Sequence, residues 1–276
     1  MTRSIPIAVS TGSLYPLPTL ESIRTLQEIG IQNIELTLQS SEFHLSFERT
    51  LRMPILPELM KLVQEGKLHV GSVHGPIIFW GHANNLWARR EYLLHSIAVC
   101  RQLGASILVL HPLHLIQTQE AALDYLAGNV SLHSTLLPGV FEIFAEASSA
   151  NVILALENIQ DWADEIFFNS PANMSRFLQD IGHPAFGCTL DLMHAQFPEL
   201  LDDFVDCLPT KIVNIHAADL LPPAHRAPLG KGVIEWKRVI PRLVALPHLR
   251  QITIELSHPQ GKDILESHKL LSDLMS

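Results

Sequence analysis

Two patterns of apolar and polar positions alternate along the chain. Short apolar runs rich in Val, Ile and Leu are typical of buried parallel strands, and the longer stretches between them repeat their apolar residues every three or four positions, as amphipathic helices do. Gly30 and Gly104 follow two of the helical stretches as stop signals. The predicted strands cover residues 5–10, 33–36, 69–74, 106–111, 151–157, 186–191, 211–216 and 251–256.

A predicted helix follows or precedes each of these strands. Eight alternations within 276 residues favour an α/β fold of the (β/α)8 TIM barrel type, with a parallel eight-stranded barrel, over a doubly wound sheet. Because no linker or low-complexity tract interrupts the pattern, we expect a single domain over residues 1–276. The predicted helices cover residues 20–29, 57–64, 86–103, 141–150, 172–181, 202–207, 236–246 and 262–275.

Composition narrows the class of protein. A hydrophobic content of 47% allows a large buried core, and neither a membrane-spanning apolar stretch nor a signal peptide is apparent, so we expect a soluble, cytoplasmic protein. Nineteen basic against 28 acidic residues give a formal charge of −9, which argues against a broad nucleic-acid interface. Three widely spaced cysteines indicate neither a disulfide framework nor a zinc-thiolate site.

Six of the predicted strands end on a residue that can bind a metal. Because the C-terminal ends of barrel strands form one open face, we expect these side chains to share a divalent metal site. The mixture of carboxylates and imidazoles suits Mn, Co, Zn, Fe or Mg and does not select among them. His194, three positions after one of them, can face the same mouth. The six residues are His74, His111, Glu157, Asp191, His216 and Glu255.

Two further regions leave alternatives open. Glu35 ends the second predicted strand and fits either a supporting contact, such as a salt bridge, or a catalytic role. After the seventh strand, Arg226 and Lys231 accompany Gly230 and Gly232 in a loop. Backbone amides and basic side chains there could hold a phosphate or carboxylate of a substrate, or the glycines could simply shape a turn.

Seven short motifs together resemble one known superfamily. They are HGP (74–76), HP (111–112), LEN (156–158), LDLMH (190–194), IH (215–216), G-x-G (230–232) and IEL (254–256). This combination is similar to the xylose-isomerase-like TIM barrels. That superfamily includes sugar and sugar-phosphate isomerases and epimerases, together with the endonuclease IV type of apurinic-site nuclease, AP endonuclease family 2. The resemblance covers nearly the whole chain.

The epimerase branch implies one divalent ion held by Glu157, Asp191, His216 and Glu255. Glu157 and Glu255 would move a proton at the carbon between them, through an enediolate that the metal stabilises. The predicted substrate contacts are His74, His111, His194, Arg226 and Lys231.

The nuclease branch implies more metal ions, with His74, His111 and His194 as additional ligands. It also has a D-x-H element before the G-x-G loop, where this chain has Ala224 and Arg226, with His225 out of register by one. A third zinc is therefore not expected. The epimerase pattern has gaps as well, because a Glu and an Arg that bind substrate in that branch correspond here to Ala163 and Pro222.

The sequence therefore predicts an enzyme: a divalent-metal-dependent isomerase or epimerase of a sugar, sugar phosphate or related polyol compound. The alternatives are an endonuclease IV-like zinc-dependent phosphodiesterase acting on abasic DNA, and an idle barrel that binds a carbohydrate or a partner protein. The leading prediction has a small carbohydrate as partner, with no nucleic acid and no membrane. The resemblance also suggests a homo-oligomer.

Overall fold

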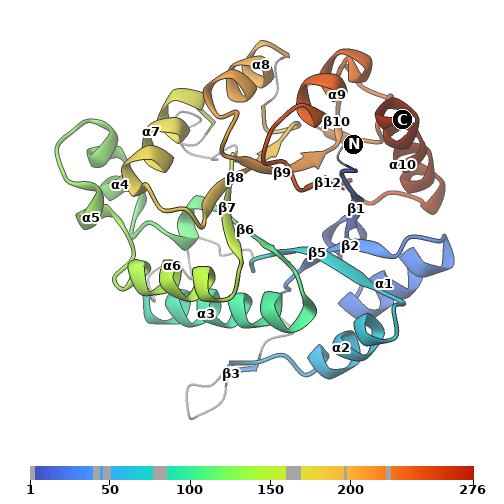
Figure 1. Ribbon diagram of the computed structural model, residues 1–276, viewed down its shortest axis with the longest axis horizontal. Helices are drawn as coiled ribbons and strands as arrows, with labels where there is room; N and C mark the ends of the chain where they lie inside the picture. The colour runs from blue at the N-terminus through green and yellow to red at the C-terminus, as the bar shows by residue number, and fades with distance from the viewer. Residues whose placement is uncertain are drawn as a thin grey trace.

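The computed structural model describes residues 4–39, 44–45, 51–76, 86–159, 169–195, 198–221 and 225–276. Eight parallel strands close into a barrel in the order β1-β12-β9-β8-β7-β6-β5-β2, and helices surround it (Figure 1). The predicted (β/α)8 TIM barrel is confirmed. The barrel strands are β1 (Ile7–Ser10), β2 (Asn33–Thr37), β5 (His69–His74), β6 (Ile107–Leu110), β7 (Ile153–Glu157), β8 (Phe186–Asp191), β9 (Ile212–Ala217) and β12 (Gln251–Ile254).

The outer helices follow the predicted periodicity. In α9, the buried residues Trp236, Val239, Ile240 and Leu243 recur at helical spacing and face the barrel. Gly30 and Gly104 have left-handed backbones, with φ of 83° and 74°, as stop residues require. These helices are α1 (Thr19–Glu28), α2 (Leu56–Gln64), α3 (Leu86–Leu103), α6 (Val140–Ser149), α7 (Pro171–Ile181), α8 (Pro198–Cys207), α9 (Trp236–Val244) and α10 (Gly261–Met275).

Two irregularities in strand register set the height of polar side chains in the barrel. The pairing of β8 with β9 shifts between Cys188 and Thr189, and beyond this point Asp191 lies opposite His216. The pairing of β2 with β5 shifts after Ile34, so that Glu35 pairs with Ser72. Such bulges redirect side chains near functional sites, and here they level the polar residues of neighbouring strands.

Several short elements were not predicted. An antiparallel pair follows β9, and two helices and a 3-10 turn occupy the connection after β6. Among the described residues, no helix is long and apolar enough to cross a membrane. The additional elements are η1 (Thr11–Leu14), β3 (His44–Leu45), β4 (Leu51–Arg52), η4 (Pro112–His114), α4 (Gln119–Leu126), α5 (Leu132–Thr135), β10 (Asp219–Leu221) and β11 (His225–Ala227).

Candidate metal centre

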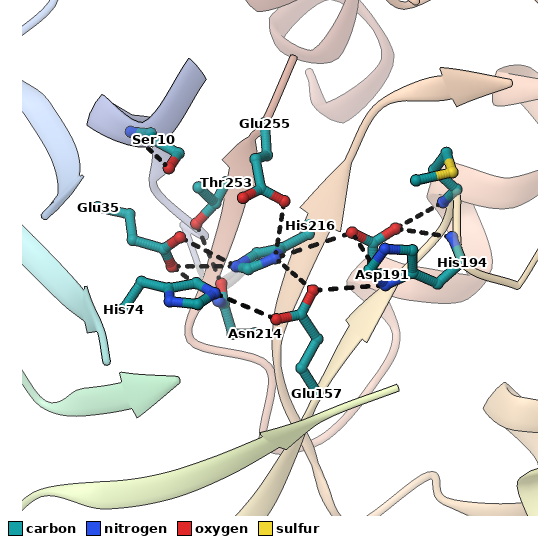
Figure 2. Close-up of polar contacts among 12 residues, drawn as sticks. Ser10, Glu35, His74, Glu157, Asp191, His194, Asn214, His216, Thr253 and Glu255 are labelled. Atoms are coloured by element: carbon teal, nitrogen blue, oxygen red, sulfur yellow. Dashed lines mark hydrogen bonds and ion pairs between the residues drawn. The ribbon is translucent and has the colours of Figure 1, made fainter. Parts of the chain in front are cut away.

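Four predicted ligands meet at the C-terminal mouth of the barrel (Figure 2). Glu157, Asp191, His216 and Glu255 each offer one ligand atom, and these atoms lie within 4.8 Å of one another. The first three are buried and Glu255 is partly exposed. We call them the four-ligand group. Three carboxylates and one imidazole form a donor set that fits a divalent cation.

A second cluster shares one carboxylate with the first. His74, His111 and Glu157 also bring ligand atoms within 4.8 Å of one another, and we call them the three-ligand group. Oε2 of Glu157 lies 3.3 Å from Nε2 of both histidines, whereas its Oε1 lies 3.2 Å from Nδ1 of His216. Glu157 therefore presents one oxygen to each group.

Asn158 fixes the backbone of Asp191 in place, and two backbone N–H groups hold its carboxylate. The Asn158 side chain accepts from the backbone N–H of Asp191 at 2.7 Å and donates to its carbonyl at 3.0 Å, which ties the ends of β7 and β8 together. Oδ1 of Asp191 accepts from the backbone N–H groups of Met193 and His194. Its other oxygen, Oδ2, faces the other three ligands of the group. Asn158 had no predicted role, although its place directly after Glu157 was a signal.

Burial and mutual charge shift the pKa values within the cluster. Burial alone would raise the pKa of Glu157, but the surrounding histidines, above all His216, lower it well below its usual value. Burial likewise opposes the charge on His74, yet the hydrogen bond and charge of Glu157 raise the His74 pKa to about 9. The pKa of His216 is raised well above normal against burial, by the charges of Glu35, Glu255 and Glu157. Glu157 is thus a carboxylate between two protonated imidazoles, those of His74 and His216, whereas burial lowers the pKa of His111.

Arg226 reaches the cluster from β11. Its Nη2 donates to Oδ2 of Asp191 at 2.7 Å, and its Nη1 donates to Oε2 of Glu255. Burial opposes the charge of this guanidinium, but the carboxylates of Asp191 and Glu255 raise its pKa above the normal value. His194 lies beside it: Nδ1 donates to the carbonyl of Asn158 at 2.7 Å, and Nε2 accepts from Arg226 at 3.3 Å. Arg226 therefore neutralises two of the four ligands.

The loop that contains Lys231 binds the carboxylate of Asp219 and not the ligand cluster. The backbone N–H groups of Gly230 and Ile234 donate to the buried carboxylate of Asp219, at 2.9 and 3.0 Å. Nζ of Lys231 lies 3.5 Å from the Glu266 carboxylate, and its side chain is exposed. The structure does not bring Lys231 to the cluster, so its contact with substrate stays a prediction. Asp219, which organises this loop, was missed because its partners, backbone N–H groups and the indole N–H of Trp236, leave no recognisable pattern in the sequence.

A cavity of about 260 Å³ opens beside the cluster. Glu255, Arg226 and His74 line it from the side of the two ligand groups, and Tyr15, Thr37 and His258 are among the residues that complete it. A small molecule in this cavity would contact Glu255 and Arg226 directly. The positions of the two gaps in the epimerase pattern, together with Ala224, lie outside the described residues.

A comparison with family models decides the classification. The model of the xylose isomerase-like TIM barrel matches residues 23–274. The chain belongs to this family. The predicted superfamily is therefore confirmed.

The individual relatives are distant. A probable endonuclease 4 from Mycoplasma pneumoniae is 25% identical over 191 residues, an alignment that spans 62% of this chain and 61% of that protein. A D-tagatose 3-epimerase-like protein has a similar structure, with a TM-score of 0.73, 19% identity and coverage of 98% of this chain and 97% of the other. D-psicose 3-epimerase from Clostridium cellulolyticum H10 gives a TM-score of 0.70, 11% identity and coverage of 99% and 100%. At these identities the two structures establish the shared fold, and the relatives named as an endonuclease and an epimerase are enzymes.

Proposed function

We propose that this protein is a divalent-metal-dependent isomerase or epimerase of a sugar, sugar phosphate or related polyol compound. The observation that supports it best is the placement of two glutamates around the four-ligand group. Glu157 ends β7 and Glu255 follows β12, and the barrel order puts β8 and β9 between those strands. The glutamates therefore approach from two sides, with Asp191 and His216 between them. That arrangement suits removal of a proton on one face of a carbon and its return on the other.

Each side chain has a role in this proposal. Glu157 and Glu255 accept and return the proton. Burial would raise the pKa of both carboxyl groups, but the neighbouring positive charges lower it, so both stay ionised at neutral pH. A bound divalent cation would stabilise the negative charge that develops on the substrate oxygens. His194 and His74 lie beside Glu157, and their contact with the substrate oxygens is part of the proposal. His111 contacts the same oxygen of Glu157 as His74 does, and it is the third histidine beside this glutamate.

Exchange of a substrate proton with solvent tests the proposal directly. The purified protein, loaded in turn with Mn²⁺, Co²⁺, Zn²⁺ or Mg²⁺, would be incubated in D₂O with a panel of ketoses and their phosphates. We expect one sugar to gain deuterium at a carbon next to its carbonyl and to yield an epimer or isomer, as NMR would show. A chelator should stop both processes. If no sugar on a panel covering the common ketoses exchanges, the proposal fails.

A phosphodiesterase acting on abasic DNA is the second candidate. The observation in its favour is the carboxylate of Glu157, which presents one oxygen to each ligand group and so could join two metal ions. The similarity to a probable endonuclease 4 points the same way, whereas the net charge of −9 weighs against a nucleic-acid substrate. Two zinc ions per chain, and chelator-sensitive nicking of a duplex with one abasic site, would establish this alternative.

The substrate partner, the cellular location and the oligomeric state of the protein are further proposals. We propose a small carbohydrate as the partner and the cytoplasm as the location. Assembly into a homo-oligomer is also a prediction, which sedimentation of the purified protein would test.

A further inference from the structure

Glu35 lies beside the ring of His216, on the side opposite Asp191 (Figure 2). Its side chain is buried, and its Oε1 and Oε2 lie 3.0 and 3.1 Å from Nε2 of His216. Thr37 of the same strand lines the cavity, but among the described residues that do so Glu35 is absent. Glu35 can therefore act on the site through His216, without touching a substrate.

A chain of hydrogen bonds that begins at Gln251 makes the Glu35 carboxylate a hydrogen-bond acceptor. The amide Nε2 of Gln251 donates to the hydroxyls of Ser72 at 2.7 Å and Thr253 at 2.8 Å. Because each hydroxyl accepts from the amide, each has its own proton left to donate. Ser72 donates that proton to Oε2 of Glu35 at 2.7 Å. A side chain at Gly71 would disturb this chain, since a Cβ there would lie 1.9 Å from Oε1 of Gln251.

The second branch reaches the same carboxylate. Thr253 donates to Oδ1 of Asn214 at 3.2 Å, and Nδ2 of Asn214 donates to Oε2 of Glu35 at 3.3 Å. Both branches thus deliver donors to Glu35. A carboxylate that receives them is an acceptor, so the proton between Glu35 and His216 belongs to Nε2 of the imidazole.

The opposite ring nitrogen faces the ligands. Nδ1 of His216 lies 3.2 Å from Oε1 of Glu157 and 3.2 Å from Oε2 of Glu255. We propose that Glu35 is a positioning residue, which keeps a proton on Nε2 of His216 and so directs Nδ1 of that ring at a divalent cation. A carboxylate in this position also increases the basicity of a ligating imidazole. The inference rests on the metal dependence of the proposed function and not on the reaction.

The decisive variant is Glu35→Gln, which preserves size and removes an acceptor. In the glutamine, an NH₂ group takes the place of one carboxylate oxygen and the negative charge is lost, so the oxygen that lies 3.0 Å from Nε2 of His216, or the one that Ser72 and Asn214 share, no longer accepts. Zn²⁺ affinity would be measured by competition with a chromophoric chelator at fixed pH. We expect it to fall about 10- to 100-fold, the usual effect of losing such a partner. The visible absorption of bound Co²⁺ should change as well, because the imidazole ligand is altered.

Thr253→Val is the matched control. It removes a hydroxyl from the same network but leaves both contacts of Glu35 with His216 and with Ser72. We expect its Zn²⁺ affinity and Co²⁺ spectrum to stay close to those of the parent protein, within about threefold for the affinity. A merely structural role of Glu35 would instead lower the melting temperature of both variants and leave the affinity of both unchanged.

A measurement on the parent protein makes the test independent of how the variant folds. Long-range ¹H–¹⁵N correlation spectra of the Zn²⁺-loaded protein should show His216 with its proton on Nε2. A proton on Nδ1, or unchanged Zn²⁺ affinity in Glu35→Gln, overturns the inference, as does a parent protein that binds no divalent cation. If metal binding follows the expectation and no sugar exchanges its proton, the proposed function fails and the role of Glu35 stands.

Discussion

Replacement of Arg226 by glutamine should make this protein bind a divalent cation more tightly. Asp191 has already committed Oδ1 to two backbone N–H groups, so Oδ2 is the atom available to a cation. Arg226 binds that same oxygen at 2.7 Å and also binds Oε2 of Glu255. A cation at the four-ligand group and the guanidinium therefore compete for shared oxygens.

The size of the effect follows from the charges. A divalent cation and a guanidinium about 5 Å apart, on either side of one carboxylate oxygen, repel each other by about 6.6 kcal/mol at an effective dielectric constant of about 20. The Arg226 side chain is 14% exposed and lines the cavity, so it can rotate away and relieve most of this repulsion. We expect a remainder of about 1.4 to 2.8 kcal/mol, which corresponds to an affinity gain of about 10- to 100-fold in Arg226→Gln.

Calorimetric titration with Zn²⁺ or Mn²⁺ would measure the change, with Arg226→Lys as a control that keeps the positive charge. The lysine variant should bind close to the parent affinity. Without added metal, Arg226→Gln should melt at a lower temperature than the parent, because the buried carboxylate of Asp191 loses its ion pair, and metal should restore the difference. Equal or weaker metal binding by Arg226→Gln would refute the competition.

Three further predictions concern other parts of the site. Glu255→Gln should lower kcat by about 10²- to 10⁴-fold and leave the fold intact, because it removes a proton acceptor and preserves the size of the side chain; a rate within threefold of the parent contradicts its role. Gly232→Ala should lower the free energy of unfolding by about 1 to 3 kcal/mol in urea titrations, because the added Cβ would lie 2.3 Å from the Leu220 carbonyl oxygen; an unchanged midpoint would show that the loop yields. The raised pKa of His74, about 9, means that this imidazole must lose a proton before it can bind a cation, so affinity at the three-ligand group should rise about tenfold from pH 7 to pH 8 and level off above pH 9. Titrations at those three pH values check it, and a flat profile would contradict it.

The barrel and the ligand positions could be predicted because both depend on local patterns. Strands such as β8 and β9 are buried along their whole length, which leaves a clear apolar run in the sequence, and a polar residue at the end of the run stands out. Parallel closure then brings all such ends to one mouth, whatever the loops do. The strand ends predicted six candidate ligands, and the family resemblance assigned four of them to one ion: Glu157, Asp191, His216 and Glu255. The structure brings the ligand atoms of these four together, and metal binding by them stays a prediction.

The partners of these ligands could not be predicted in the same way. Arg226 arrives on β11, a three-residue strand whose pairing with β10 produces no periodicity that a sequence reveals. The loop around Gly230 left two interpretations, and the deciding fact is that its amides bind Asp219, eleven positions earlier. For Glu35 the alternatives of a supporting or a catalytic role differ only in what the side chain touches. That is a property of the barrel interior.

The polar layer around Glu35 is costly for folding, and this cost supports a role in the site. The interior of such barrels is ordinarily filled with branched apolar side chains. Here the hydrogen bonds of four buried polar residues lead to the carboxylate of Glu35; they are Gln251, Ser72, Thr253 and Asn214. Apolar packing of similar volume would commonly be as stable or more stable than a buried charged pair. It would, however, leave Nε2 of His216 without an acceptor, and the ring would then be free to place its proton on the nitrogen that faces Glu157 and Glu255.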